Sequence, residues 1–159
     1  MISDEMRASI GVEGPTSRHD VDKTGIRMFA RSVGHTDLIF YDEDYAKGRG
    51  HRSLVAPPGY LGTTSFRPGA AQGGPAAGPG GGRPAAGGRP RRVLNGGTEY
   101  EYTGVEICAG DVLTSVGKVV SIDQVASSLG QMLITRRESK YTNQNGEVVC
   151  RSYGTGLQY

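Results

Sequence analysis

The sequence predicts an α+β domain of two layers, in which helices pack against a single antiparallel sheet. Three observations support this prediction. An apolar stripe at helical spacing lies in the first quarter of the chain, runs of β-branched residues follow in the second half, and an Asn-Gly pair marks a hairpin near the end. The chain has 159 residues, which is enough for one core, so we expect residues 1–159 to form one domain.

The first predicted element is a helix from Asp20 to Val33. Asp20 and Asp22 place negative charge where the N-terminus of a helix favours it. Gly34 follows the last apolar residue, where a glycine commonly ends a helix. One apolar stripe at helical spacing runs along this segment and consists of Ile26, Phe29, Ala30 and Val33.

Two shorter helical segments are predicted next. Residues 42–47 favour one or two turns, with Asp42 as the N-cap. Pro57 and Pro58 then favour the start of a helix over about residues 57–66, because a missing N–H does no harm in the first turn of a helix.

Residues 67–92 differ from the rest of the chain. They consist almost entirely of Gly, Pro, Ala and Arg and include no acidic residue. They show no apolar periodicity, so we interpret them as a disordered, flexible insertion within the domain. The arginines of this insertion either meet the phosphates of a CoA or carrier-protein arm, or keep a solvated loop soluble.

The second half of the chain is typical of an antiparallel sheet. Residues 99–102 alternate glutamate with tyrosine, which places the tyrosines on one face of a strand and the glutamates on its solvent face. Residues 112–122 are rich in β-branched side chains, and residues 130–141 continue the pattern. Asn145-Gly146 favours a tight type I′ turn, after which residues 147–154 return as the partner strand.

Composition and charge restrict the classes of partner. The net charge is only +2, so we expect no nucleic-acid partner. No apolar run approaches the roughly 20 residues that span a bilayer, and residues 1–9 lack the apolar centre of a signal peptide. We therefore expect no membrane association and a cytoplasmic location.

Cys108 and Cys150 lack metal-ligand spacing and are either two buried thiols or a disulfide. We expect no metal and no cofactor.

The order of these segments resembles the MaoC-like dehydratases, and above all their N-terminal half or separate subunit. The resemblance implies a single hot-dog fold, in which a curved antiparallel sheet wraps a central helix. It runs from about residue 10 to the end and leaves out only the insertion. The stretches that carry it are Phe29-Ala30 through Gly34, Val55-Ala56-Pro57-Pro58, Leu94-Asn95-Gly96-Gly97, Ala109-Gly110-Asp111 and Tyr141 through Glu147.

The resemblance also indicates which half this chain is. Catalytic halves of the family carry a Gly-Asp-x-Asn-Pro-x-His segment, which falls here on residues 34–40. His35 stands at the position of the catalytic aspartate, and Phe40 stands at that of the histidine. Asp37 and Leu38 occupy the asparagine and proline positions. Phenylalanine neither donates nor accepts a proton, so the water-activating pair is not present at these positions.

Candidate site residues fall into two groups. His35, together with Asp37, either acts alone as an acid or base, or is a polar residue that the negative end of the preceding helix stabilises. The substrate-binding candidates lie where the family's acyl chain runs beside the central helix, and a glycine there permits close approach of a ligand. These candidates are Ala56, Pro57, Pro58, Gly59, Tyr60, Asn95 and Gly96, with Phe66 as a further tunnel residue.

The leading hypothesis is a subunit of an enoyl-thioester hydratase or (3R)-hydroxyacyl-thioester dehydratase. This chain would complete a double hot-dog and its acyl tunnel, for CoA or acyl-carrier-protein thioesters, while a MaoC-like catalytic subunit, or a second copy of the chain, supplies the other half. One alternative is a hot-dog acyl-CoA thioesterase, in which Asp37→Ala would abolish hydrolysis. The other is a non-enzymatic module that binds acyl thioesters without turnover.

Overall fold

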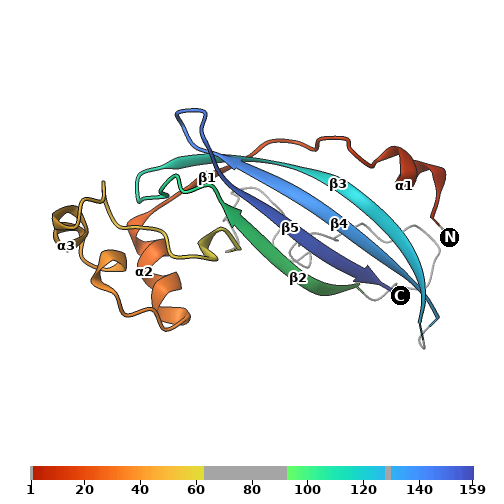
Figure 1. Ribbon diagram of the computed structural model, residues 1–159, viewed down its shortest axis with the longest axis horizontal. Helices are drawn as coiled ribbons and strands as arrows, with labels where there is room; N and C mark the ends of the chain where they lie inside the picture. Colours follow the sequence, from red (N-terminus) through yellow and green to blue (C-terminus); the bar gives the residue numbers. More distant parts are fainter. Residues whose placement is uncertain (1, 63–92, 128–129) are drawn as a thin grey trace.

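An antiparallel sheet curls along its length, with the helical segments of residues 23–48 at one of its ends and the short helix of residues 4–8 near the other (Figure 1). The computed structural model describes residues 2–62, 93–127 and 130–159. Within these ranges five strands pair in the order β1-β3-β4-β5-β2. Their bounds are β1 Ser17–Asp20, β2 Val93–Tyr102, β3 Val112–Ser127, β4 Gly130–Thr142 and β5 Val148–Gln158. The predicted insertion over residues 67–92 lies outside the described residues.

Three short α-helices and two 3-10 turns complete the described elements: α1 Asp4–Ala8, α2 Lys23–Ser32, η1 Leu38–Phe40, α3 Glu43–Gly48 and η2 Tyr60–Gly62. The predicted N-cap Asp42 is confirmed, since its side chain accepts from the amides of Asp44 and Tyr45. Asp22, predicted as negative charge at the start of the first helix, is the N-cap of α2 and accepts from the amide of Gly25. Gly34 follows α2 at a φ of +78°, as a glycine that ends a helix does. No helix in the described part of the chain is long and apolar enough to cross a membrane.

The predicted first helix is too long at its start. Residues 17–20 form β1, which pairs with β3 from Ser17↔Ser115 to Asp20↔Val112. The amide of Val21 donates to the carbonyl of Asp111 at 2.9 Å and extends this pairing. The acidic residue that begins α2 is therefore Asp22, and Asp20 belongs to the strand before it. A four-residue edge strand has too short an alternation to be recognised from sequence.

The helix predicted over residues 57–66 is not formed in its described part. Gly59 lies at a φ of +86°, a left-handed conformation that interrupts a helix, and only Tyr60–Gly62 form a single 3-10 turn. Residues 63–66 lie outside the described ranges, and Phe66 is among them. The prolines therefore begin a turn within the described segment.

The last hairpin is present, but its turn is not the predicted type I′. That turn requires positive φ at both central residues, and no residue other than glycine has positive φ in the described chain. The amide of Gly146 donates to the carbonyl of Asn143 at 3.1 Å, and Asn143 donates to Glu147 at 2.9 Å. These bonds and the φ of +83° at Gly146 define a three-residue loop. The side chain of Asn143 accepts from the amides of Asn145 and Glu147. These bonds stabilise the loop, which therefore needs no second residue with positive φ.

The hydrophobic core lies between α2, the segment that precedes η2 and the nearer half of the sheet. Its fully buried members include Ile26 and Ala30 of α2, Leu54, Leu113 and Val149. Ile26 and Ala30 of the predicted apolar stripe therefore lie in a core that helix and sheet share, which confirms the α+β class, whereas Val33 of the same stripe is 51% exposed. Cys108 and Cys150 are both free and buried, so the interpretation as two thiols is confirmed.

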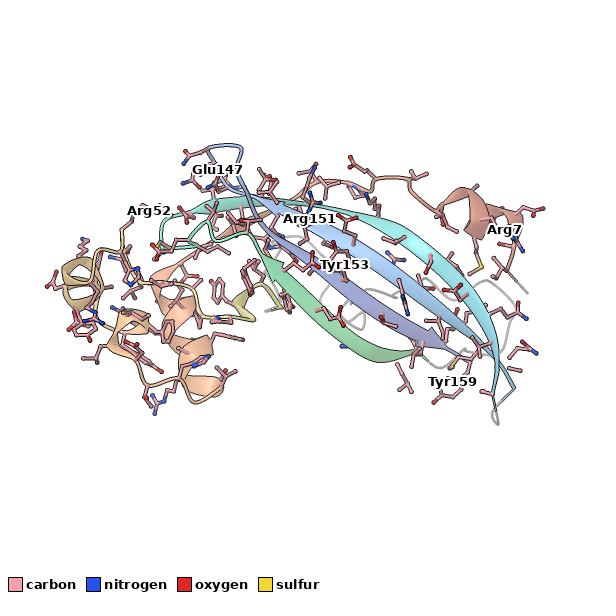
Figure 2. The ribbon with its side chains drawn as sticks, in the orientation of Figure 1. Arg7, Arg52, Glu147, Arg151, Tyr153 and Tyr159 are labelled. Atoms are coloured by element: carbon pink, nitrogen blue, oxygen red, sulfur yellow. The ribbon has the colours of Figure 1, made fainter. Side chains whose placement is uncertain are left out.

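Ion pairs on one face of the sheet fix the register of three strands. Glu138 of β4 binds Arg151 of β5 at 2.7 Å and Lys118 of β3 at 3.1 Å. Hydrogen bonding to Lys118, and then to Arg151, holds the pKa of the Glu138 carboxyl below its usual range although partial burial opposes this. Figure 2 shows Arg151 and Tyr153 along β5. Opposite charges on adjacent strands support the pairing through side chains as well as the backbone.

We predict that Gly96→Ala lowers the free energy of unfolding by about 1–3 kcal/mol, because overpacking has that cost. A Cβ at Gly96 would lie 3.0 Å from Thr155 Cγ2 and 3.1 Å from the Thr155 carbonyl oxygen. Gly48→Ala is the matched control, since its Cβ would meet no atom within 4 Å in α3. This control should be neutral or stabilising. Urea unfolding of both variants measures the difference, and equal stabilities would contradict the prediction.

Candidate functional site

His35 and Asp37 lie between α2 and η1 and are held by local contacts. The Asp37 carboxylate accepts from the amide of Ile39 at 3.1 Å and caps η1. The His35 ring packs on the ring of Phe40, with 5.3 Å between their centroids. Tyr41 donates its hydroxyl to the carbonyl oxygen of His35 at 2.5 Å, and the amide of His35 donates to Ala30 at the end of α2. These contacts give both side chains a structural role at this turn.

Phe40, which the resemblance aligns with the family's catalytic histidine, is part of the hydrophobic core. Only 8% of its surface is exposed, and it packs in the same cluster as Ile26, Ala30 and Leu54. A residue buried in this way stabilises the turn by about 1.5–3 kcal/mol through removal of apolar surface from water. Phe40 therefore anchors the segment 34–40 in the hydrophobic core.

Ala56 and Pro58 line a hollow of about 160 Å³ at the surface. The other walls come from the end of β2 and from the connection between β2 and β3. The full lining is Val55, Ala56, Pro58, Tyr102, Gly104, Val105, Glu106 and Ile107. Two of the predicted substrate-binding residues are thus brought together, and they meet a wall that follows almost 50 residues later in the chain.

The other candidates from the same segment face the core instead. Pro57 is fully buried, and Tyr60 is 8% exposed. The Tyr60 ring meets Phe29 of α2 edge-on, with centroids 6.0 Å apart, and burial raises the pKa of its hydroxyl. Gly59 donates its amide to the hydroxyl of Tyr102 at 2.8 Å, which ties the segment to β2. Tyr60 therefore packs in the core.

Asn95 and Gly96 lie far from the hollow. They sit at a bulge of β2, where the side chain of Asn95 accepts from the amide of Gly97 at 2.9 Å. Asn95 and Tyr102 are seven positions apart, so about 23 Å of strand lies between them at roughly 3.3 Å per residue. The structure does not bring these two candidates together with Ala56 and Pro58.

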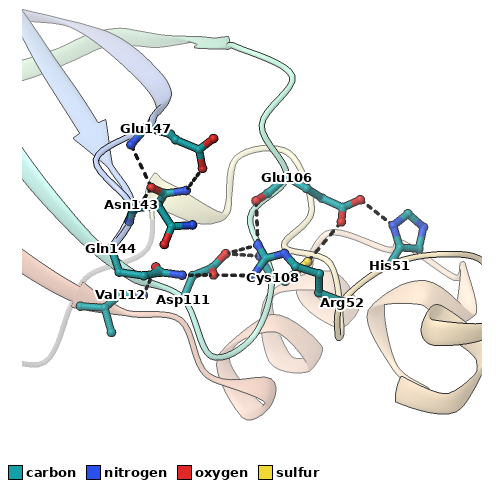
Figure 3. Close-up of polar contacts among 10 residues, drawn as sticks. His51, Arg52, Glu106, Cys108, Asp111, Val112, Asn143, Gln144 and Glu147 are labelled. Carbon is teal, nitrogen blue, oxygen red and sulfur yellow. Dashed lines mark hydrogen bonds and ion pairs between the residues drawn. The ribbon is translucent and has the colours of Figure 1, made fainter.

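A polar cluster beside the hollow was not predicted from the sequence (Figure 3). The Asp111 carboxylate, 1% exposed, accepts two hydrogen bonds from the guanidinium of Arg52, both at 2.9 Å. It also accepts from the amide of Cys108 at 2.8 Å and from the side chain of Gln144 at 3.0 Å. Burial raises the pKa of Asp111, but these donors outweigh it and hold the pKa below its usual range.

Glu106 connects this cluster to the hollow that it lines. One of its carboxylate oxygens contacts His51 Nδ1 at 2.5 Å, and the other accepts from the thiol of Cys108 at 3.4 Å. Burial, and then the neighbouring Glu106, raise the pKa of the Cys108 thiol to about 11, so this thiol is not a nucleophile at neutral pH. Arg52 and Asp111 are 59 residues apart, and no local sequence pattern links partners at that distance. Across the described residues, no group of three or more His, Cys, Asp or Glu is placed to hold a metal ion.

Comparison with known proteins identifies the family. The family model of the FAS1-like dehydratase domain region matches residues 8–152. The chain belongs to this family. Among the relatives of this chain, a UPF0336 protein of Streptomyces avermitilis is 31% identical over 114 residues, which are 72% of this chain and 70% of the relative. A UPF0336 protein of Streptomyces griseus is 30% identical over 135 residues, 85% of this chain and 81% of the relative.

Solved structures show the same fold at low identity. A C-terminally truncated HadBC (3R-hydroxyacyl-ACP dehydratase) complex of Mycobacterium tuberculosis is 19% identical, with a TM-score of 0.63 and full coverage of both chains. A MaoC-like dehydratase of Rhodospirillum rubrum is 23% identical, with a TM-score of 0.61, over 94% of this chain and 92% of that one. The (R)-hydratase of A. caviae is 12% identical, with a TM-score of 0.61, over 92% and 94%. The chain therefore has the hot-dog fold that the resemblance implied.

We predict that Asp111→Asn lowers the free energy of unfolding by about 2–4 kcal/mol at pH 7, because the buried donors lose a charged acceptor. The pKa of Asp111 is depressed in the folded state, so its contribution is present above the usual value of about 3.9 and is lost as pH falls below it. Unfolding curves of both proteins from pH 7 to pH 3 should therefore converge in acid. A difference that stays constant to pH 3 would show that the charge of Asp111 does not stabilise the fold.

Proposed function

We propose that this chain is the supporting half of an enoyl-thioester hydratase or (3R)-hydroxyacyl-thioester dehydratase. A MaoC-like catalytic subunit supplies the aspartate and histidine, and this chain completes the double hot-dog and the tunnel for the acyl group. The carrier of the thioester is CoA or an acyl carrier protein, and the reaction takes place in the cytoplasm. One observation carries the proposal: the frame of the catalytic segment is kept, while its two reactive positions hold His35 and the core residue Phe40.

Hydration of a 2,3-enoyl thioester requires a group that moves a proton at C2 and a base that activates water at C3. The Asp37 carboxylate is engaged by the amide of Ile39, and the His35 ring lies on Phe40. Neither arrangement reproduces an imidazole–carboxylate pair at this turn. The same observation weighs against a thioesterase that depends on Asp37. It supports a heteromer in which this chain binds the acyl group and shapes the tunnel, while the partner carries out the proton transfers.

Known relatives of this fold supply a precedent for such a division. The comparison includes a HadBC complex and a ChsH1-ChsH2 complex, both from Mycobacterium tuberculosis and both named as pairs of subunits. The ChsH1-ChsH2 structure is 15% identical to this chain, with a TM-score of 0.61, over 94% of this chain and 98% of that one. These likenesses support a heteromer as the form in which the chain works.

The sheet offers one edge for such a partner. The amides of Gly11 and Gly14 donate to carbonyls of β3 at 2.8 Å each, so residues 10–14 cover the edge of β3 beyond β1. At the other edge, β2 pairs only with β5 among the described strands, and nearly all of its side chains are exposed. An edge with unpaired N–H and C=O groups favours addition of another strand. We propose that the partner sheet continues from β2.

We predict that the purified chain alone does not hydrate crotonyl-CoA and that a mixture with a MaoC-like catalytic subunit does. Spectrophotometric loss of the enoyl absorbance measures both rates. His35→Ala in the mixture should change the rate by less than about threefold, whereas removal of a general acid or base costs about 10²–10⁴-fold. Hydration by the chain alone at the rate of the mixture would contradict the proposal, and a large loss in His35→Ala would assign catalysis to this residue.

We predict that Thr98→Lys, at the centre of β2, weakens association with the partner by more than about tenfold, because a lysine on an edge strand opposes strand addition. Val120→Lys is the control. Val120 is 45% exposed on β3, and β4 and β5 lie between β3 and β2. Analytical ultracentrifugation of each variant with the catalytic subunit, or of the variant alone if the chain pairs with itself, gives the dissociation constants. Equal weakening by both variants would place the interface elsewhere.

A further inference from the structure

The hollow beside Glu106 has walls that are fixed by backbone pairing. Val55 and Cys108 form an antiparallel bridge, the amide of Ala56 donates to Ile107 at 2.8 Å, and the amide of Ala109 donates to Leu54 at 2.9 Å. These bonds join the segment that precedes η2 to the connection that precedes β3. The hollow is therefore preformed, and a ligand would bind without ordering a loop.

The size and lining of the hollow restrict what fits in it. Its volume of about 160 Å³ compares with a dry cavity of about 150 Å³ that holds one benzene molecule. The side chains of Val55, Ala56, Val105 and Ile107 are apolar and have no hydrogen bond to offer a ligand. A single six-membered ring, or a branched group of similar size, fills this space.

Glu106 gives the hollow a polar preference. Its two oxygens accept from His51 and Cys108, and an ionised carboxylate has about four acceptor sites in all, so acceptor capacity remains. A carboxylate cannot donate, so a ligand must bring the hydrogen. The guanidinium of Arg52 donates to the backbone carbonyl of Glu106 at 3.2 Å, and this nearby positive charge disfavours an ammonium group.

We propose that this hollow binds an alicyclic or branched apolar group of about six carbons that carries a hydroxyl, which donates to Glu106. Binding here does not depend on which reaction the assembled protein performs. The test is therefore a binding measurement on the full chain without any partner or turnover, and failure of the proposed catalytic role leaves its outcome unchanged.

The probes are cyclohexanol and cyclohexanone, which share a ring and differ in whether the oxygen donates or only accepts. We expect cyclohexanol to produce saturable shifts of the amide signals of Val105, Glu106 and Ile107 in nuclear magnetic resonance titrations. Cyclohexanone should bind at least about tenfold more weakly, as loss of a hydrogen bond to a charged group implies. Equal affinities, or shifts that saturate only at other residues, would overturn the proposal.

Two variants distinguish the effect of the hydrogen bond to Glu106 from the effect of the volume of the hollow. Glu106→Gln adds a donor in place of a carboxylate oxygen, so the preference for the alcohol should fall to less than about threefold. Ala56→Leu leaves Glu106 in place and fills part of the hollow, so both probes should lose saturable binding even if Glu106→Gln fails to fold. Circular dichroism confirms that each variant is folded. An unchanged affinity for cyclohexanol in folded Ala56→Leu would overturn the site.

Discussion

The buried carboxylate of Asp111 holds together the part of the molecule on which the candidate site depends. A carboxylate that loses water in this way is stable only if donors replace the water. Arg52, the amide of Cys108 and Gln144 provide those donors. They come from the loop after α3, from the turn before β3 and from the last hairpin. Because one side chain requires all three, their relative positions are fixed, and the two walls of the hollow are brought side by side.

The turn over residues 34–40 is stabilised by contacts that involve no acid–base pair. Phe40 contributes packing to the core, and Asp37 caps η1, so the turn that would carry chemistry is stabilised by apolar burial and backbone capping. Neither contribution requires an acid–base pair. One fold serves different roles in this way, because the core and the reactive groups are separate sets of residues. Residues 10–14 cover the edge of β3 beyond β1, whereas β2 pairs only with β5 among the described strands.

Local signals predicted the elements that depend on neighbouring residues. Asp42 was recognised as a cap, and Asp22 was recognised as negative charge at the start of a helix. The alternation at Tyr100 and Tyr102 placed both rings on one face, where they stack with 6.2 Å between centroids. The helix over residues 57–66 was predicted from two prolines, but the left-handed conformation of Gly59 ends any helix there. The type I′ turn was predicted from Asn145-Gly146, but the side chain of Asn143 selects a different loop. In both cases a residue outside the dipeptide changed the outcome: Gly59 after the two prolines, and Asn143 before Asn145-Gly146.

The sequence by itself predicted the two-layer class and the long strands of the second half of the chain, because periodicity and capping act over a few residues. That His35 and Phe40 replace both reactive positions is what the resemblance implies, and it stays a prediction. The tertiary structure alone decided that Ala56 and Pro58 face Glu106 across a hollow, that Tyr60 turns to the core, and that Asn95 lies at the far end of β2. It also joined Arg52 to Asp111 across 59 residues. Contacts of this kind follow from how distant segments pack together, and no spacing along the chain encodes them.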